Sequence, residues 1–201
     1  MKPKTDTWTI VATGAWNTRV FAPEWVGKHL LPGPLVVEVG LTAPVRLKFV
    51  SGDMIVVPAD DRLIVGVQAA TVQAMIQAEG VMFKALELLP HTPTTGLGVN
   101  FGFEEANPDA SLISLFTFPD QDKLSKFGCT ISSQDLRRKL EIEGTILNST
   151  LSLSEGKVSI HLNFHQEGPF TVARQSAETC FNLAQKFLSS VYNEHIEEVE
   201  S

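Results

Sequence analysis

Residues 35–67 decide the fold of this 201-residue chain, and they read LVVEVGLTAPVRLKFVSGDMIVVPADDRLIVGV. Short runs of β-branched residues alternate here with Gly, Pro and Asp, a pattern typical of strands joined by tight turns. We expect four strands, at 35–41, 45–50, 54–57 and 62–67. Their regular, short spacing predicts an antiparallel meander.

The meander has two faces of different character, because successive side chains of a strand point to opposite sides. One face is almost wholly apolar and is the expected core face. The other is mixed, yet it holds five aliphatic residues: Val36, Val50, Ile55, Val57 and Ile64. An apolar area of more than a few hundred Å² on a soluble chain usually marks a contact. The alternative is that a loop or the Trp-rich N-terminus covers this face.

Further elements flank the meander. A strand at 7–13 and a helix at 22–31 precede it, and a helix at 71–89 follows it. The next segments are a strand at 96–105, a stretch at 110–118 that is ambiguous between helix and strand, a short helix at 120–127, strands at 136–146, 147–154 and 157–166, and a final helix capped by Ser176. The chain is therefore expected to be α+β, with antiparallel sheet and helices packed on one side.

The two halves share one order of elements: a strand, a short helix, three or four strands and a long helix. We predict a β-α-β₄-α unit at 1–90 and a β-α-β₃-α unit at 91–201, which together pack as two units or as one compact domain. The order is similar to the topology of the TATA-box-binding protein and other two-fold α+β folds, but a shared topology implies no function. The alternative is one continuous antiparallel sheet without a repeat.

Composition narrows the classes of function. Asp and Glu total 23 against 16 Lys and Arg, so the formal net charge is −7. This balance opposes nucleic-acid binding, which needs clustered cations to neutralise phosphates. No signal peptide and no apolar stretch of the roughly 18 residues that span a membrane are recognised. Cys129 and Cys180 are expected to be reduced and buried, which indicates a cytoplasmic location.

The aromatic candidates for binding are tryptophans near the N-terminus. Trp8, Trp16 and Trp25 all lie within the first 25 residues. Trp is enriched among the residues that contribute most to protein interfaces. Because Trp16 lies in a predicted loop, we expect it to be the most exposed of the three, with Trp25 as the second candidate. The alternative is that these tryptophans fill the core, as large aromatic side chains usually do.

The polar candidates are histidines. His161 and His165 share the polar face of one predicted strand, roughly 13 Å apart, which is too far to ligate one metal ion. His91 follows the first long helix and has the chemistry of a general base, but no motif ties a nucleophile to it. No catalytic, metal or cofactor motif is recognised, and we expect neither cofactor nor metal. Gly96, Gly98 and Gly102 indicate bulges or close backbone approach within their strand.

These patterns lead to three hypotheses about function. The first is a non-catalytic binding or assembly protein that uses the apolar sheet face of the N-terminal half to bind a protein partner or a second copy of the chain. The second is an enzyme or small-ligand-binding protein with a pocket between sheet and helices, near His91 or the His161 and His165 face. The third is a nucleic-acid-binding sheet, which the net charge opposes.

Overall fold

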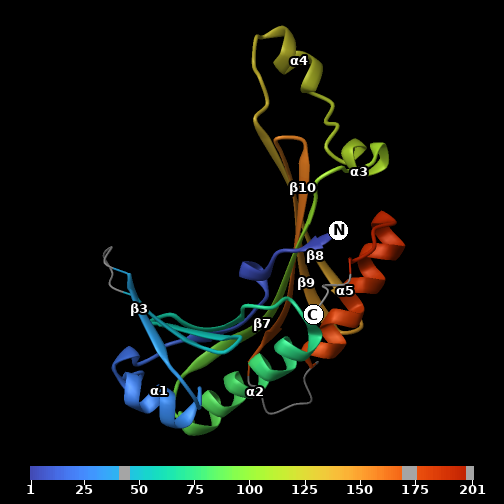
Figure 1. The fold of residues 1–201 in the computed structure, drawn as a ribbon. Helices are drawn as coiled ribbons and strands as arrows, with labels where there is room; N and C mark the ends of the chain where they lie inside the picture. Colours follow the sequence, from blue (N-terminus) through green and yellow to red (C-terminus); the bar gives the residue numbers. More distant parts are fainter. Residues whose placement is uncertain (41–45, 169–175, 198–201) are drawn as a thin grey trace.

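The computed structural model describes residues 1–40, 46–168 and 176–197. In these ranges the chain forms one ten-stranded antiparallel sheet and five α-helices (Figure 1). The predicted α+β class, with a large antiparallel sheet, is confirmed.

The described strands lie in the order β3-β4-β5-β6-β2-β7-β10-β9-β8, and β1 pairs with one end of β7. Their bounds are β1 Lys2–Pro3, β2 Thr9–Gly14, β3 Val36–Gly40, β4 Arg46–Ser51, β5 Met54–Ala59, β6 Arg62–Val67, β7 Thr94–Glu105, β8 Ser133–Ile142, β9 Thr145–Ser154 and β10 Lys157–Glu167. The meander predicted from residues 35–67 is present as β3 to β6. Its expected strand ends at Leu41 and Val45 lie outside the described residues.

The helices are α1 Pro23–His29, α2 Val72–Leu88, α3 Ala110–Ser114, α4 Gln121–Lys126 and α5 Ala177–Tyr192, with short 3₁₀ turns η1 Thr5–Thr7 and η2 Thr18–Val20. The ambiguous stretch at 110–118 therefore begins as a helix. Ser176 caps α5 as predicted, because its Oγ accepts a hydrogen bond from the backbone N–H of Thr179. Helix α4 and the segments that connect it extend beyond the ends of β8 and β10 (Figure 1).

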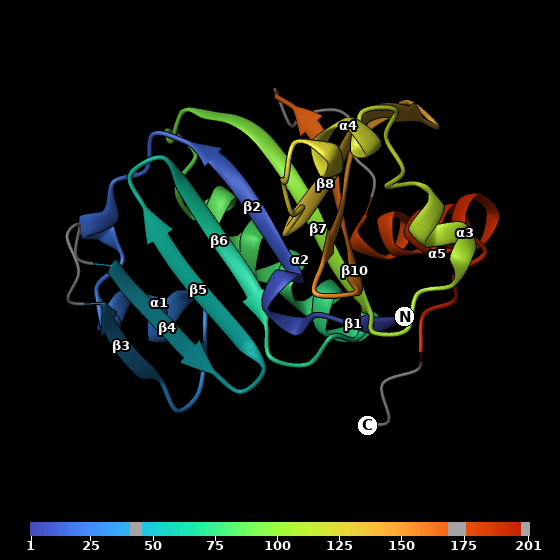
Figure 2. The same ribbon diagram turned by 90° about the horizontal axis from the view of Figure 1, so that it is seen from above.

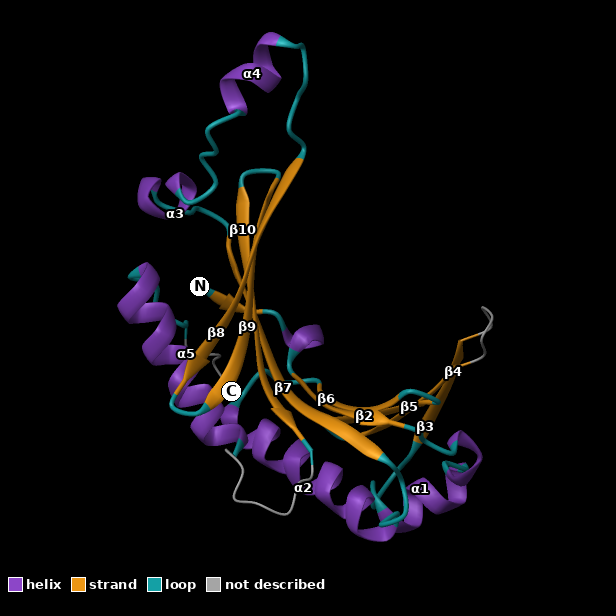
Figure 3. Ribbon diagram, turned by 180° about the vertical axis from the view of Figure 1, so that it is seen from behind, coloured by secondary structure: helices purple, strands orange, loops and turns teal. Residues whose placement is uncertain are grey.

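The sheet is continuous across the two halves of the chain, because β2 pairs with β7 at its centre. It curves strongly around this pair, and α1, α2 and α5 lie along its convex side (Figure 3). These three helices thus pack on one side of the sheet, and the concave side faces away from them. The division of the chain into units at 1–90 and 91–201 stays a prediction.

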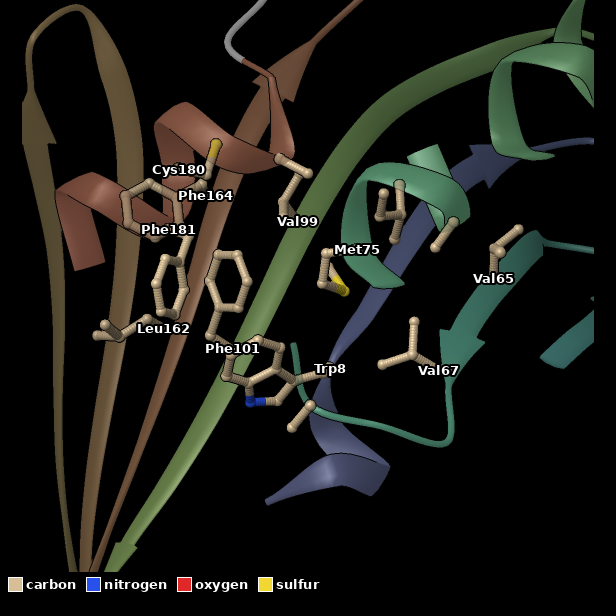
Figure 4. Close-up of a cluster of buried hydrophobic side chains, with 14 of the residues drawn as sticks. Trp8, Val65, Val67, Met75, Val99, Phe101, Leu162, Phe164, Cys180 and Phe181 are labelled. Atoms are coloured by element: carbon tan, nitrogen blue, oxygen red, sulfur yellow. The ribbon is translucent and has the colours of Figure 1, made fainter. Parts of the chain in front are cut away.

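An aromatic cluster fills the core where the N-terminal segment, β7 and α5 meet (Figure 4). Trp8 is 1% exposed, and its indole Nε1 donates a hydrogen bond to the carbonyl oxygen of Gly102 at 3.1 Å. Its ring centroid lies 5.0 Å from that of Phe101 and 5.5 Å from that of Phe181. Such edge-on and tilted ring pairs add stability beyond the area that they bury.

The turn between β8 and β9 differs from the prediction. Glu143 and Gly144 form it, with φ values of 49° and 77°, so β9 begins at Thr145. Two successive residues with positive φ are typical of a two-residue hairpin turn. The prediction of one strand from 136 to 146 was therefore wrong. Ile146 belongs to β9, where it pairs with Glu141 and His165 on the face opposite the core.

The expectation of two buried cysteines is correct for one of them. Cys180 is buried in α5, whereas Cys129 is exposed in the segment between α4 and β8. Cys129 precedes β8, which begins only at Ser133. Both thiols are free.

Replacing Trp8 with Ala should lower the free energy of unfolding by about 3–5 kcal/mol, the usual cost of deleting a large buried aromatic side chain. Urea unfolding followed by far-ultraviolet circular dichroism measures the change. Trp25→Ala is the matched control, and because Trp25 is only half-buried its loss should be smaller. Equal losses in the two variants would contradict the central position of Trp8.

One thiol per folded chain should react quickly with a disulfide reagent such as Ellman's reagent, and unfolding should release a second. Burial, together with the nearby charge of Glu79, raises the pKa of Cys180 to about 12, so its reactive thiolate is scarce. Cys129→Ser should remove the fast reaction, while Cys180→Ser should leave it unchanged. A fast reaction of both thiols in the folded protein would refute this assignment.

Candidate functional site

The concave side of the sheet carries a contiguous group of aliphatic side chains. Residues directly opposite each other on neighbouring antiparallel strands point to the same face. The register places Val36 opposite Val50, Val50 opposite Ile55, and Val57 opposite Ile64. Ile64 in turn lies opposite Val11 of β2. We call this set the apolar part of the concave face: Val11, Val36, Val50, Ile55, Val57 and Ile64.

The apolar part is accessible to solvent. Val36 is 59% exposed, and the other five side chains are half-buried. The alternate residues of the same strands, such as Phe49, Val56 and Val65, are buried under the helices. Figure 2 views the concave side, with α1 and α2 behind the strands. Of the described segments, η1 lies on this side, near the ends of β6 and β7.

A row of side-chain hydrogen bonds crosses the other part of the concave face. Nδ2 of Asn148 donates to Oδ1 of Asn163 at 3.0 Å, and Nδ2 of Asn163 donates to Oδ1 of Asn100 at 2.8 Å. Nδ2 of Asn100 then donates to Oγ1 of Thr9 at 3.2 Å. This asparagine ladder, Thr9–Asn100–Asn163–Asn148, links β2, β7, β10 and β9, and it crosses the joint between the two halves.

Glycines on β7 make room for the ladder. A Cβ atom at Gly98 would lie 2.6 Å from Nδ2 of Asn163, and one at Gly96 would lie 2.7 Å from Cε1 of His165. Both distances are shorter than carbon and nitrogen atoms tolerate without displacement. The close approach predicted for these glycines is confirmed: side chains of β10 lie across the backbone of β7.

His161 and His165 lie on the concave face of β10, one on each side of Asn163. His161 is opposite Gly102 of β7 and Thr150 of β9. It is half-buried, and this burial lowers the pKa of His161 below its usual value because the charged imidazolium is poorly solvated there. The neutral ring is therefore favoured near neutral pH.

Several cations of the concave face are paired with carboxylates. Nζ of Lys48 lies 3.1 Å from Oε2 of Glu38, and Arg137 lies 3.2 Å from Asp135. Arg62 pairs with the adjacent Asp61, which also raises the pKa of Arg62. These neighbouring carboxylates oppose phosphate binding, which needs a surplus of positive charge.

The two tryptophan candidates lie away from the concave face. Trp16 is 4% exposed, and its Nε1 donates to the carbonyl oxygen of Ala12 at 3.0 Å. The expectation that it is exposed was wrong, because its loop folds back and the backbone N–H of Trp16 bonds to the carbonyl of Asp60. Trp25 is half-buried on α1, with its ring centroid 5.4 Å from that of Phe21.

The nine candidate residues from the sequence thus fall into three places. His91 is exposed in the segment between α2 and β7, and Trp16 and Trp25 lie among N-terminal loop and helix residues. The sheet brings the remaining six to its concave face: Val36, Ile55, Val57, Ile64, His161 and His165. Sequence reasoning missed Val11 and the ladder residues Thr9, Asn100 and Asn148. Only the strand pairings reveal that these side chains join the same face: β2 pairs with β6 and β7, β7 with β10, and β10 with β9.

A cavity of about 160 Å³ lies between the sheet and α5. Its lining residues are Leu97, Val99, Glu143, Gly144, Thr145, Phe164, His165, Gln166 and Cys180. Small-molecule sites usually measure about 300–1,000 Å³, so this cavity gives little support to a ligand pocket between sheet and helices. His91 and His161 do not line it.

Among the described residues, no group of three His, Cys, Asp or Glu side chains has an arrangement that holds a metal ion. None of the described helices has the length and apolar character needed to cross a membrane.

No protein-family model matches the chain, and a comparison with curated proteins finds no relative. The function is therefore argued from the geometry of the concave face.

Protein stability should decrease as the pH falls below about 6.5, the pKa of an unperturbed histidine. The pKa of His161 is lowered in the folded state, so as the pH falls the imidazole of the unfolded chain is protonated first, which favours unfolding. The loss of stability is complete once the pH lies below the pKa of His161 in the folded protein. Urea unfolding between about pH 5 and pH 8 measures this slope.

His161→Asn should flatten that slope, since asparagine does not titrate. His91→Asn is the control at an exposed histidine and should leave the slope as in the unmodified protein. An unchanged slope in His161→Asn would show that burial of this imidazole is not its cause.

Proposed function

We propose that this protein is a non-catalytic binding or assembly protein, and that a protein partner docks on the apolar part of the concave face. The observation that carries the proposal is the contiguity of six aliphatic side chains on a sheet face that α1, α2 and α5 leave uncovered. A solvated face of an antiparallel sheet is normally polar. The part of the same face around the asparagine ladder follows that rule, and the apolar part does not.

The surroundings of the apolar part fit a protein partner. Protein interfaces combine a centre poor in charge with a polar rim. Here the ion pairs Lys48–Glu38 and Arg62–Asp61 lie at the borders of the aliphatic group, and the asparagine ladder begins beside Val11 at Thr9. A partner segment with an apolar ridge and polar flanks would match this arrangement.

A nucleic-acid partner and a small ligand are less well supported. The face carries carboxylates next to Lys48, Arg62 and Arg137, and the whole chain has a net charge of −7. The cavity between the sheet and α5, which His165 lines, is smaller than typical ligand sites.

We also propose that the two halves are a pseudo-repeat, as their order of elements predicts. In each half the first strand of more than two residues pairs with the last, β2 with β6 and β7 with β10, and β2 and β7 pair with each other. Under this proposal the halves have diverged on the concave side, where one is aliphatic and the other is rich in Asn and His.

A cytoplasmic location is proposed from the state of the thiols. Cys129 is exposed and free, and Cys180 is buried and free. An exposed free thiol is typical of a protein kept in a reducing compartment.

The proposal is tested with the double variant Val57→Thr, Ile64→Thr, which keeps β-branched side chains on the strands and makes the face polar. The unmodified protein should enhance the fluorescence of the apolar dye anilinonaphthalene sulfonate, and the variant should lose about half of that signal or more. Quantitative affinity purification should likewise show a partner that the variant no longer retains.

Val191→Thr is the matched control, because this valine is 54% exposed on α5. It should keep both the dye signal and the partner, with circular dichroism confirming that all three proteins are folded. Partners retained equally by the double variant would refute the apolar part as the docking site.

A further inference from the structure

The two edges of the sheet differ in how they are protected. Strands β3 and β8 are the two edge strands of the sheet in the described residues. The ten residues of β8 include five charged ones: Asp135, Arg137, Arg138, Lys139 and Glu141. Among the five residues of β3, Glu38 is the charged one, and Lys48 of β4 already neutralises it at 3.1 Å. Charges, prolines and bulges are what usually prevent edge strands from pairing with other chains.

Strand β3 has neither a proline nor a bulge. Its register with β4 runs without a shift from Val36 opposite Val50 to Gly40 opposite Arg46. Its outer edge therefore presents a regular row of backbone N–H and C=O groups. Such a row is a template for a further strand.

Valines are exposed on both faces of β3. Val36 is 59% exposed on the concave side, and Val39, opposite Leu47, is 50% exposed on the side of the helices. A partner lying on one face of the sheet would cover only one of these valines. A strand added beside β3 would flank both, so the exposure pattern favours pairing at the edge over docking on a face.

We propose that β3 pairs in antiparallel orientation with β3 of a second copy of this chain, about a two-fold axis perpendicular to the sheet. This is the arrangement in which one surface is complementary to itself. The two sheets then form one continuous sheet, and both concave faces lie on the same side. The proposal does not depend on the partner-binding role of the concave face.

Electrostatics and side-chain shape select the register. A two-fold axis through Glu38 would place the Glu38 carboxylates of the two copies directly opposite each other, and like charges in that position repel. An axis at Val37 places Leu35 opposite Val39 of the second copy, and Val36 opposite its Glu38. Leu35, Val37 and Val39 of both copies then form one apolar strip on the helix side.

The dimer should be weak and dependent on concentration. A single pair of short strands buries less than the roughly 1,200–2,000 Å² of a standard interface, so we expect a dissociation constant in the micromolar range. In sedimentation equilibrium the mean mass should rise with concentration from the 22.0 kDa of one chain toward twice that value.

The double variant Val36→Lys, Val39→Lys places a charge on each face of the edge at positions that are already exposed, so the fold should tolerate it. It should weaken association by at least about tenfold, as lysines do on natural edges. Val191→Lys adds one such charge at a comparably exposed valine and should associate like the unmodified protein. A mass that stays at one chain at every concentration, or dimers that persist in the edge variant, would overturn the proposal.

Disulfide cross-linking tests the register. In a Cys129→Ser background, Val37→Cys lies opposite itself across the axis and should form an intermolecular disulfide under mild oxidation. Val191→Cys in the same background measures random collisions between exposed thiols. Cross-linking through Val37→Cys that is no faster than through Val191→Cys would overturn pairing about Val37.

Discussion

The antiparallel pairing of β2 with β7 is the contact on which the rest of the structure depends. Each of these strands also pairs with the last strand of its half, β6 beside β2 and β10 beside β7. Glycines leave gaps on the concave side of β7 on either side of Asn100, so Asn163 lies across Gly98, and Thr7 of η1 approaches Gly102. A side chain at Gly98 would collide with the asparagine ladder, which ties the two halves together. The core contacts the same pair of strands on the other face of the sheet, where Trp8 packs on Phe101 of β7.

Local patterns of the sequence predict most of the fold. The strands from β3 to β5 are short, mostly apolar runs that end at or next to Gly or Asp, and such runs depend little on distant residues. The prediction fails where distant contacts or unusual turns decide the outcome. Glu143 occupies a left-handed conformation that glycine or asparagine would have signalled, so the boundary between β8 and β9 was misplaced. Trp16 is buried because its loop returns to Asp60, a contact more than forty residues away in the chain.

Only part of the concave face can be predicted from the sequence. Alternation within one strand separates Ile55 and Val57 from the core residues, and this requires no knowledge of the neighbouring strands. The contiguity of the face does require it. Val11 joins the aliphatic group because β2 pairs with β6, and Asn100 joins Asn163 because β7 pairs with β10. These pairings connect distant segments, and no local pattern encodes their register.

The two parts of the concave face have different capacities for binding. Asn100 uses its amide nitrogen on Thr9, and its amide oxygen accepts from Asn163, so this part of the ladder is already satisfied within the chain. A ligand would have to break such bonds, and exchanging one hydrogen bond for another gains little free energy. Side chains such as Ile55 and Ile64 lose nothing on contact and gain about 25 cal/mol for each Å² of apolar surface removed from water. The driving force for the proposed docking therefore resides in the N-terminal half, while the ladder joins the two halves through the hydrogen bond between Asn100 and Thr9.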